Sequence, residues 1–393
     1  MPLKTLLKKF TQEPPLGWAQ LSHQKIRMIV AVSGIAFADI LIFMQLGFYH
    51  SIFDGVTRVN ENLTGDLYLV SSRAKFIDDG QNFDRRHLYQ ADAVEGIDSA
   101  SPFYYSHAGW VNPWNKKVTD VAILAFDPTR PVLNLPDVNQ QLSQIKLPDK
   151  VLVDRQARPD LGAIAQSFDN GEPVVTEVSG RRIRVGGMFD FGSTLFVEGF
   201  LVTSDWNYLR LNGADSIDQV KVGVLNIDSG ENLETVKARV RASMPAEVAV
   251  MTHQEFVAAE KDFWDKNHPA GAIFNFGVAM GFVVGVVIVY QVLFADVNDH
   301  LSEYATLKAM GYRDRNLLTV VFQEATILAV LGFVPGLVAS IGMYGLLESL
   351  TQMPLAMSSE VAWRVFSLTV TMCLASGAIA IRKLQSADPA DVF

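Results

Sequence analysis

Residues 271–294 read GAIFNFGVAMGFVVGVVIVYQVLF, a stretch without a single charged side chain. About 20 such residues are enough for an α-helix to cross about 30 Å of hydrocarbon. A surface helix of a soluble domain would instead carry polar residues along one face. The stretch therefore predicts a membrane-spanning helix, around which the rest of the chain can be interpreted.

Three further apolar stretches are long enough to span a membrane. The first, 26–50, contains Asp39 within its apolar core, and the others are 317–347 and 365–381. The stretch 26–50 begins too far from the N-terminus and runs too long for a cleaved signal peptide, so we interpret it as a stable anchor. Together the four stretches predict four transmembrane helices.

The composition excludes several classes of protein. The chain has 393 residues, 33 basic and 42 acidic, and its net charge of −9 argues against a nucleic-acid binder. Cys373 is the single cysteine, which excludes an internal disulfide and a multi-cysteine metal site. No glycine is followed by lysine, so the phosphate-binding loop of ATPases is absent from the sequence. We predict no catalytic residue, no metal ion and no cofactor on this chain.

Basic residues predict the orientation in the membrane, because they collect on the cytoplasmic side. They are Lys4, Lys8, Lys9, Lys25, Arg27, Lys308, Arg313, Arg315, Arg382 and Lys383. Both termini are therefore expected in the cytoplasm, with the protein in a bacterial inner membrane. The predicted order is a cytoplasmic amphipathic segment at 1–25, a span at 26–50, a periplasmic domain at 51–270, a span at 271–294, a cytoplasmic loop at 295–316, a span at 317–347, a periplasmic loop at 348–364, a span at 365–381 and a cytoplasmic tail at 382–393.

Residues 51–270 are too many for a loop between two helices and predict a folded α+β domain. Runs rich in Val, Ile and Phe, separated by Gly, Asp, Asn and Pro, predict its strands. Ser204 is expected to cap one of its helices. The predicted strands are 66–71, 120–126, 173–178, 182–188, 194–203 and 218–227, and the predicted helices are 84–94, 205–211 and 232–242.

Both ends of this domain carry helical patterns that adjoin a span. Residues 51–63 continue the first span with apolar residues at near-helical spacing. Thr252 and Glu255 have the spacing of a capping box and open a stretch that leads into the second span. We interpret both segments as helical stalks that carry the domain. Separate short amphipathic helices are the alternative.

Aromatic residues gather in the segment 100–118. Docking surfaces are enriched in aromatic anchors, so Phe103, Tyr104, Trp110 and Trp114 are candidates for contact with a partner protein. The alternative is that they pack in the core of the domain.

Small residues in the spans predict close contacts between helices. Gly277, Gly281 and Gly285 recur every four residues in the second span, and Gly332 and Gly336 lie in the third. Such spacing lets two helix backbones approach closely in lipid. We expect these faces to pack against another helix, either across a dimer or within one chain.

Two acidic residues, Asp39 and Glu324, lie inside predicted spans. Acids in the membrane are costly and usually face protein or water. We interpret them as structural polar contacts or as the lining of a hydrated vestibule, with a proton relay as the alternative.

The segment 296–316 reads DVNDHLSEYATLKAMGYRDRN. Its apolar residues recur every three positions and predict a short amphipathic helix that ends at Gly311. Glu303 and Lys308 on this helix are available to a partner, and anchoring to the membrane surface is the alternative. The apolar residues are Leu301, Tyr304, Leu307 and Met310.

The residues 302–311, SEYATLKAMG, resemble the coupling-helix signature of MacB-type ABC transporter permeases, the superfamily that includes LolC, LolE and FtsX. The tail 387–391, ADPAD, resembles the ending of these permeases, with Asp391 in place of their glutamate. The order of one helix, a large external domain and three helices is also similar to theirs. The signature positions are matched by Glu303, Ala305, Lys308, Ala309 and Gly311. The resemblance implies that the residues contacting an ATPase are Leu301, Glu303, Tyr304, Leu307, Lys308 and Gly311.

Within that superfamily, residues 14–27 and the lack of a fused ATPase resemble the cyanobacterial DevC permeases. The resemblance implies a homodimer, a separate DevA-like ATPase that binds ATP and Mg, a DevB-like periplasmic adaptor and a TolC-like outer-membrane duct. It further implies export of a lipid-like or hydrophobic cargo, glycolipids included, driven by motion passed through the stalk. The alternative is an FtsX-like signalling protein that activates a periplasmic partner without transport.

Overall fold

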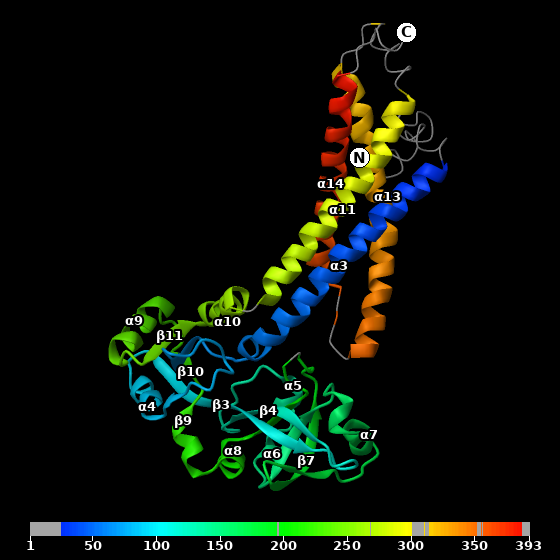
Figure 1. Cartoon of the computed structure of the whole chain (residues 1–393). Helices are drawn as coiled ribbons and strands as arrows, with labels where there is room; N and C mark the ends of the chain where they lie inside the picture. The colour runs from blue at the N-terminus through cyan, green and yellow to red at the C-terminus, as the bar shows by residue number, and fades with distance from the viewer. Residues whose placement is uncertain are drawn as a thin grey trace. The chain divides into compact units, whose positions relative to one another are not determined.

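The computed structural model describes residues 25–194, 196–267, 269–300, 310, 314–351, 355 and 357–386 (Figure 1). The side chains of 314–318, 351 and 382–386 lie outside that description. The chain divides into two compact units. The helical unit consists of Met1–Tyr49, Ala270–Leu350 and Leu355–Phe393, and the strand-containing unit of His50–Pro269 and Thr351–Pro354.

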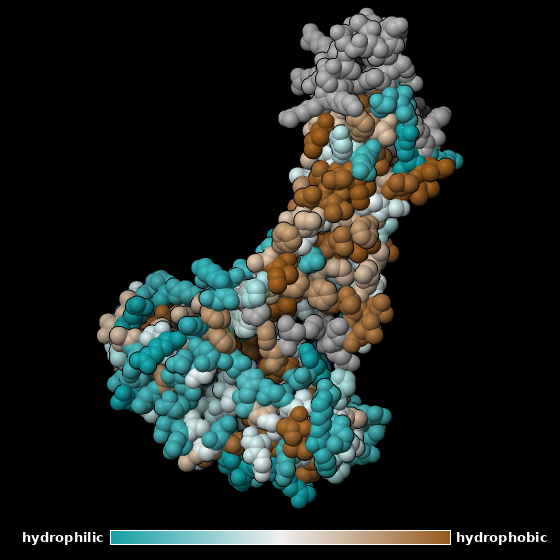
Figure 2. Space-filling view, viewed as in Figure 1, coloured by the Kyte–Doolittle hydropathy of each residue, from teal (hydrophilic) through white to brown (hydrophobic). Residues whose placement is uncertain are grey.

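Within the described residues, four helices are long and apolar enough to cross a membrane, and each contains one of the four apolar stretches of the sequence. They are α3 (Lys25–Glu61), α11 (Pro269–Asp299), α13 (Asp314–Thr351) and α14 (Ser359–Ser386). All four helices extend beyond the predicted spans, and the largest extension is that of α3, which continues past residue 50 to Glu61. Figure 2 shows mostly apolar surface over these helices and mostly polar surface over the strand-containing unit.

Small and aliphatic side chains from all four helices form the core of the helical unit. Ile35 of α3, Val289 of α11, Ala329 of α13 and Met372 of α14 are fully buried there. Lipid tails are as apolar as these side chains, so close packing rather than the hydrophobic effect must hold the helices together. The mixture of alanines and branched residues in this core suits such packing.

A nine-stranded mixed sheet forms the framework of the strand-containing unit. Adjacent strands are antiparallel except for two parallel pairs, β4 with β8 and β5 with β7. A separate pair joins β2 (Phe83–Asp84) to β9 (Gln219–Val220). Across the large sheet the order is β11 (Val248–Thr252), β1 (Leu67–Ser71), β10 (Val222–Ile227), β3 (Ile97–Val111), β4 (Val118–Phe126), β8 (Phe200–Ser204), β5 (Lys150–Asp154), β7 (Arg181–Phe189) and β6 (Val175–Val178).

The long strand β3 belongs to two parts of this sheet. Its first half, up to Phe103, pairs with β10, and its second half pairs with β4. Trp110 and Val111 near its end also pair with β6. This last pairing closes β3, β4, β8, β5, β7 and β6 into a ring, and a closed ring has no edge strand left to pair with another chain.

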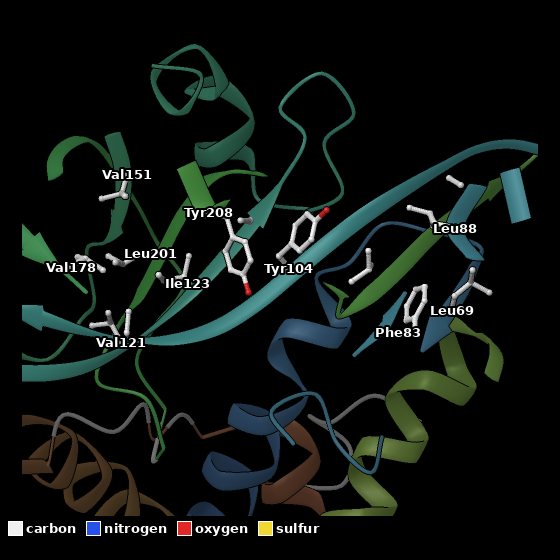
Figure 3. Close-up of a cluster of buried hydrophobic side chains, with 14 of the residues drawn as sticks. Leu69, Phe83, Leu88, Tyr104, Val121, Ile123, Val151, Val178, Leu201 and Tyr208 are labelled. Carbon is white, nitrogen blue, oxygen red and sulfur yellow. The ribbon is translucent and has the colours of Figure 1, made fainter. Parts of the chain in front are cut away.

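The core of the unit follows β3 from one part to the other (Figure 3). Val121, Val178 and Leu201 gather within the ring of strands, whereas Leu69 and Leu88 lie near the other end of β3. The shared strand thus joins two strand arrangements through one apolar cluster, and a second cluster that includes Phe103, Leu124 and Phe126 is also buried in the unit.

Helices cover the sheet of the strand-containing unit. The side-chain hydroxyl of Ser204 accepts a hydrogen bond from the backbone N–H of Asn207, which confirms the predicted cap. The helices are α4 (Arg86–Asp92), α5 (Pro136–Gln140), α6 (Leu142–Ile145), α7 (Ile164–Asp169), α8 (Asp205–Asn212), α9 (Leu233–Ser243) and α10 (His253–Asn267), with short 3₁₀ turns at Pro159–Leu161 and Ala214–Asp218.

Candidate functional site

The end of α3 and the helix α10 meet at one place in the strand-containing unit, which we call the stalk joint. It consists of residues 50–61 of α3, the segment 72–82 and α10. The first two turns of α10 are fixed by the predicted capping box. The N–H of Thr252 donates to Glu255 Oε2 at 2.9 Å, and the N–H of Glu255 donates to Thr252 Oγ1 at 3.3 Å.

Glu260 lies at the centre of the stalk joint. Its side chain accepts hydrogen bonds from Asn60 Nδ2 at 3.3 Å, from the N–H of Ile77 at 2.8 Å and from Trp264 Nε1 at 3.1 Å. The residue is 3% exposed, and burial raises the pKa of its carboxyl to about 7. One carboxyl therefore connects α3, α10 and the segment 72–82.

A buried ion pair holds the segment 72–82 from its other side. Lys221 Nζ lies 3.0 Å from Asp79 Oδ1 and also donates to the carbonyl of Gln81 at 3.1 Å. Removing one partner of a buried pair leaves the other charge uncompensated and is strongly destabilising. The pair therefore ties this segment to the start of β10.

His107 of β3 connects the same segment to the sheet. Its Nε2 lies 2.7 Å from Asp78 Oδ2, and its Nδ1 is bonded to Asp120 on β4. The hydrogen bond to Asp78 is the largest cause that raises the pKa of His107, to about 9. The imidazole is therefore protonated at neutral pH and sits between two carboxylates.

Arg58 fastens α3 to a loop of the strand ring. Its Nη1 donates to the carbonyls of Phe191 at 2.8 Å and Gly192 at 2.9 Å. The carboxylate of Asp154 accepts from the N–H groups of the same two residues. Gly192 has a φ of 93°, a conformation that favours glycine, so the loop can turn both carbonyls toward the arginine.

Tyr68 of β1 contacts α10 directly. Its ring stacks on Phe256 with centroids 5.0 Å apart, and its hydroxyl lies 3.0 Å from His253 Nδ1. The hydroxyl also donates to the carbonyl of Leu63 at 2.8 Å, just after α3 ends. Both α3 and α10 are thus attached to the sheet through side chains as well as through the backbone.

The structure places the glycines of α11 against other helices of the same chain. A Cβ on Gly281 would lie 2.8 Å from Ile42 Cγ1 of α3. Gly277 meets Gln45 of α3 in the same way, and Gly285 meets α14. This face of α11 therefore contacts other helices of the same chain, which is one of the two alternatives that the sequence predicts.

Gly332 and Gly336 of α13 also face α3. Gly332 meets Ile35, and a Cβ on Gly336 would lie 3.2 Å from the carbonyl oxygen of Ala36. Since α3 receives glycine faces from both α11 and α13, it is the central helix of these close contacts.

The two acids predicted inside the spans are both buried. Asp39 accepts a hydrogen bond from Thr369 Oγ1 of α14 at 2.6 Å, which is a structural polar contact between helices. Glu324 of α13 is fully buried. At the start of α3, Arg27 Nη2 lies 2.6 Å from Asp299 Oδ2 of α11.

Of the four candidate docking aromatics, three are in the core. Phe103, Tyr104 and Trp110 have no exposed surface, because β3 is an interior strand whose side chains pack on both faces of the sheet. This corrects their assignment as anchors for a partner. Trp114, which is 51% exposed and lies in the turn between β3 and β4, is the one that a partner can reach.

The residues expected to contact an ATPase lie outside the described residues. They are Leu301, Glu303, Tyr304, Leu307, Lys308 and Gly311. Met310, on the same predicted apolar edge, is described and is 64% exposed.

Sequence reasoning missed Glu260, although its position carries a signal. Phe256, Glu260 and Trp264 follow one another at intervals of four residues, so the acid sits on the apolar face of an amphipathic helix. An acid in that position must be buried against a partner or be exposed together with its aromatic neighbours.

Comparisons with solved structures give limited overall similarity, over about half of this chain. The periplasmic region of MacB from Actinobacillus actinomycetemcomitans is 14% identical, with a TM-score of 0.33, over 50% of this chain and 92% of that one. The extracellular domain of the noncanonic ABC-type transporter YknZ from Gram-positive bacteria is 12% identical, with a TM-score of 0.32, over 48% of this chain and 99% of that one. A domain of a putative permease from Porphyromonas gingivalis is 12% identical, with a TM-score of 0.29, over 49% of this chain and 89% of that one.

No curated protein sequence matches the chain. The C-terminal part does match a protein family, and the match begins in α11 and extends beyond α14. Residues 275–389 match the family described as FtsX-like permease C-terminal.

Proposed function

We propose that this chain is the membrane-embedded permease subunit of an ABC transporter of the MacB and FtsX type. The observation that carries the proposal is the match of residues 275–389 to the FtsX-like permease C-terminal family. The matched region includes the segment 301–311, in which the sequence resembles a coupling helix. The four apolar helices support the membrane location.

In this proposal the chain passes motion rather than conducting cargo between its helices. A separate ATPase moves the coupling segment, and α3 and α10 pass the movement to the strand-containing unit. Support comes from the stalk joint, where Glu260, Arg58 and Tyr68 fasten those two helices to the sheet and its loops. Helices attached at several points transmit displacement instead of absorbing it in a hinge.

The finer proposal is a homodimer in a bacterial inner membrane, with both termini in the cytoplasm. A DevA-like ATPase would bind ATP and Mg, and a DevB-like adaptor would connect the permease to a TolC-like duct. The cargo would be lipid-like or hydrophobic, with a glycolipid as one case. The family match equally supports the second candidate, an FtsX-like signalling protein that moves a periplasmic partner without transport.

The ATPase contact can be tested by cysteine crosslinking in native membranes. Cys373 is buried and is the single native cysteine, so Cys373→Ala supplies a background without other thiols. Met310→Cys lies near the end of the predicted coupling segment, and Trp206→Cys, on the exposed side of α8, is the control. We expect Met310→Cys alone to crosslink to a copurifying ATP-binding subunit. Failure of Met310→Cys to capture such a subunit, or equal capture by Trp206→Cys, would contradict the proposal.

A further inference from the structure

A cavity of about 270 Å³ lies in the stalk joint. Its lining comes from the end of α3, the segment 72–82, β3, the loop before β8 and α10, all of them within the strand-containing unit. At about 30 Å³ per water molecule in the liquid, the space corresponds to about nine waters. It is large enough for a small organic molecule and smaller than most drug-sized sites.

Three aromatic rings form neighbouring walls of this cavity. The rings of Phe196 and Trp264 have centroids 4.7 Å apart, and those of Phe76 and Trp264 are 5.5 Å apart at 67°. Tyr105 adds a fourth aromatic side chain to the lining. Adjacent rings meet at different angles, 35° for Phe196 with Trp264 and 67° for Phe76 with Trp264, so the lining is aromatic over several of its walls.

The charged groups of the lining are acidic. Asp78 and Glu260 contribute carboxyls, and no lysine, arginine or histidine lines the cavity within the part of the chain that the structure describes. The nearby cations are already paired, Lys221 with Asp79 and His107 with both Asp78 and Asp120. A protonated His107 between two carboxylates leaves that cluster with one net negative charge, to which an ionised Glu260 would add another.

We propose that this cavity is a binding site for a small organic cation of the alkylammonium class. Aromatic faces attract such cations through the ring quadrupole, and the acidic lining supplies the opposite charge. A neutral molecule of the same shape would gain no charge–charge attraction from the carboxyls, and an anion would be repelled by them. The site is a property of the strand-containing unit and does not depend on the proposed transport function.

The proposal predicts a pH dependence with a defined sign. Glu260 is neutral when protonated, and its pKa is about 7, so its attraction for a cation grows as pH rises through neutrality. The charges that act around it are Lys221 and Asp79, paired to each other, and Asp78, paired to His107. His107 remains protonated across that range because its pKa is about 9. Cation affinity should therefore be lower at pH 6 than at pH 8.

The test uses the full-length protein in detergent and two probes of the same shape. One is choline, and the other is the neutral alcohol in which carbon replaces its nitrogen. Binding is measured by saturation-transfer NMR, which detects weak ligands. We expect choline to bind at least about tenfold more tightly than the neutral alcohol, and its affinity to fall between pH 8 and pH 6. Equal binding of the two probes, or no saturable binding of choline, would overturn the proposal.

Two variants separate the site from the stability of the joint. Phe196→Leu removes one aromatic wall without touching the hydrogen bonds of Glu260, and it should weaken choline binding about three- to tenfold. Glu260→Gln should remove most of the charge preference. Trp206→Leu deletes an exposed aromatic ring outside the cavity and should leave binding unchanged. Unchanged choline affinity in Phe196→Leu would place any binding elsewhere on the protein.

Discussion

At the scale of single residues, Glu260 has the most unusual environment of the stalk joint. It is almost fully buried, and its partners are an amide, a backbone N–H and an indole N–H rather than a base in direct contact. Donors of this kind stabilise a carboxylate less than an arginine does, so burial dominates and raises the pKa of the group to about 7. The joint therefore contains an acid that changes charge near neutral pH.

This environment makes the stability of the joint depend on pH. The pKa of a glutamate in the unfolded chain is about 4.3. Between about pH 4.3 and pH 7, the folded joint therefore binds a proton that the unfolded chain has released. The contribution of this proton to the stability of the folded joint is complete below the pKa of the unfolded state. It is lost as pH rises through the pKa of the folded state. From pH 5 to pH 8 the contribution of Glu260 to the free energy of opening should fall by roughly 3 kcal/mol, which hydrogen exchange of α10 and 72–82 can measure against the Glu260→Gln variant.

Glu260→Gln provides the control for that measurement. Glutamine does not titrate, so the variant should lose this pH dependence while retaining an acceptor for the N–H of Ile77. A wild-type joint whose opening free energy is flat from pH 5 to pH 8 would show that the carboxyl has a normal pKa.

At the scale of the elements, the capping box at the start of α10 is worth a direct test. Thr252→Ala removes the side-chain acceptor for the N–H of Glu255 and should cost about 1 kcal/mol of helix stability. The amides of residues 253–256 should then exchange about fivefold faster. Ser229→Ala, at an exposed position after β10, is the matched control and should leave those amides unaffected. Equal exchange in both variants would mean that packing alone fixes this helix end.

The glycines of α11 allow a second test at this scale. Gly281→Leu forces a side chain into Ile42 of α3, and overpacking of this kind costs about 1–3 kcal/mol or more. We expect a lower midpoint of thermal unfolding in detergent. Gly342→Leu is the matched control, because a Cβ at Gly342 meets nothing within 4 Å. If the two variants unfolded at the same temperature, the close contact of α11 with α3 would not contribute to stability.

Some elements could be predicted from the sequence, and the misses have physical reasons. Strands β1, β4 and β7 follow apolar runs between turn residues and were predicted within a few residues. Strand β3 was not predicted, because it is buried on both faces and its Ser, His and Gly residues break the period of two. Of the predicted strand at 194–203, only Phe200–Ser204 forms a strand among the described residues, and the side chain of Thr194 instead accepts hydrogen bonds from the N–H groups of Phe196 and Val197.

At the scale of the whole molecule, the candidate site could be predicted only in part. The helical character of 51–61 and 253–267 could be predicted because capping and amphipathic spacing are local signals. The joint itself depends on Asn60, Ile77 and Glu260, which meet across as many as 200 positions of the chain. No local sequence pattern spans a separation of that size, so such contacts can be seen only in the tertiary structure.

A partner on the strand-containing unit can be located with the exposed turn between β3 and β4. Under the proposed function, Asn115→Cys in that turn should crosslink to a periplasmic adaptor, since it adjoins the exposed Trp114. Asp262→Cys on the exposed side of α10 is the matched control and should not crosslink. Both cysteines are introduced into Cys373→Ala, and products are identified by mass spectrometry. Crosslinks confined to α10 would move the docking surface to the stalk.

Under the proposed function, the coupling of ATP hydrolysis to the whole molecule is expected to depend on Leu307. The sequence places it on the apolar edge of the predicted coupling helix, so Leu307→Asp would bury a charge in the groove of the ATPase. An unpaired buried charge costs several kcal/mol, which is enough to uncouple the movement of the permease from that of the ATPase. We expect normal membrane insertion, a loss of ATPase stimulation by the permease and at least about tenfold less export or partner activation.

Ser302→Asp, off the apolar edge, carries the same charge and should retain activity. If Leu307→Asp stimulated the ATPase as well as the wild type does, the segment would not be the contact, and the proposed transmission of motion through α3 and α10 would lose its starting point.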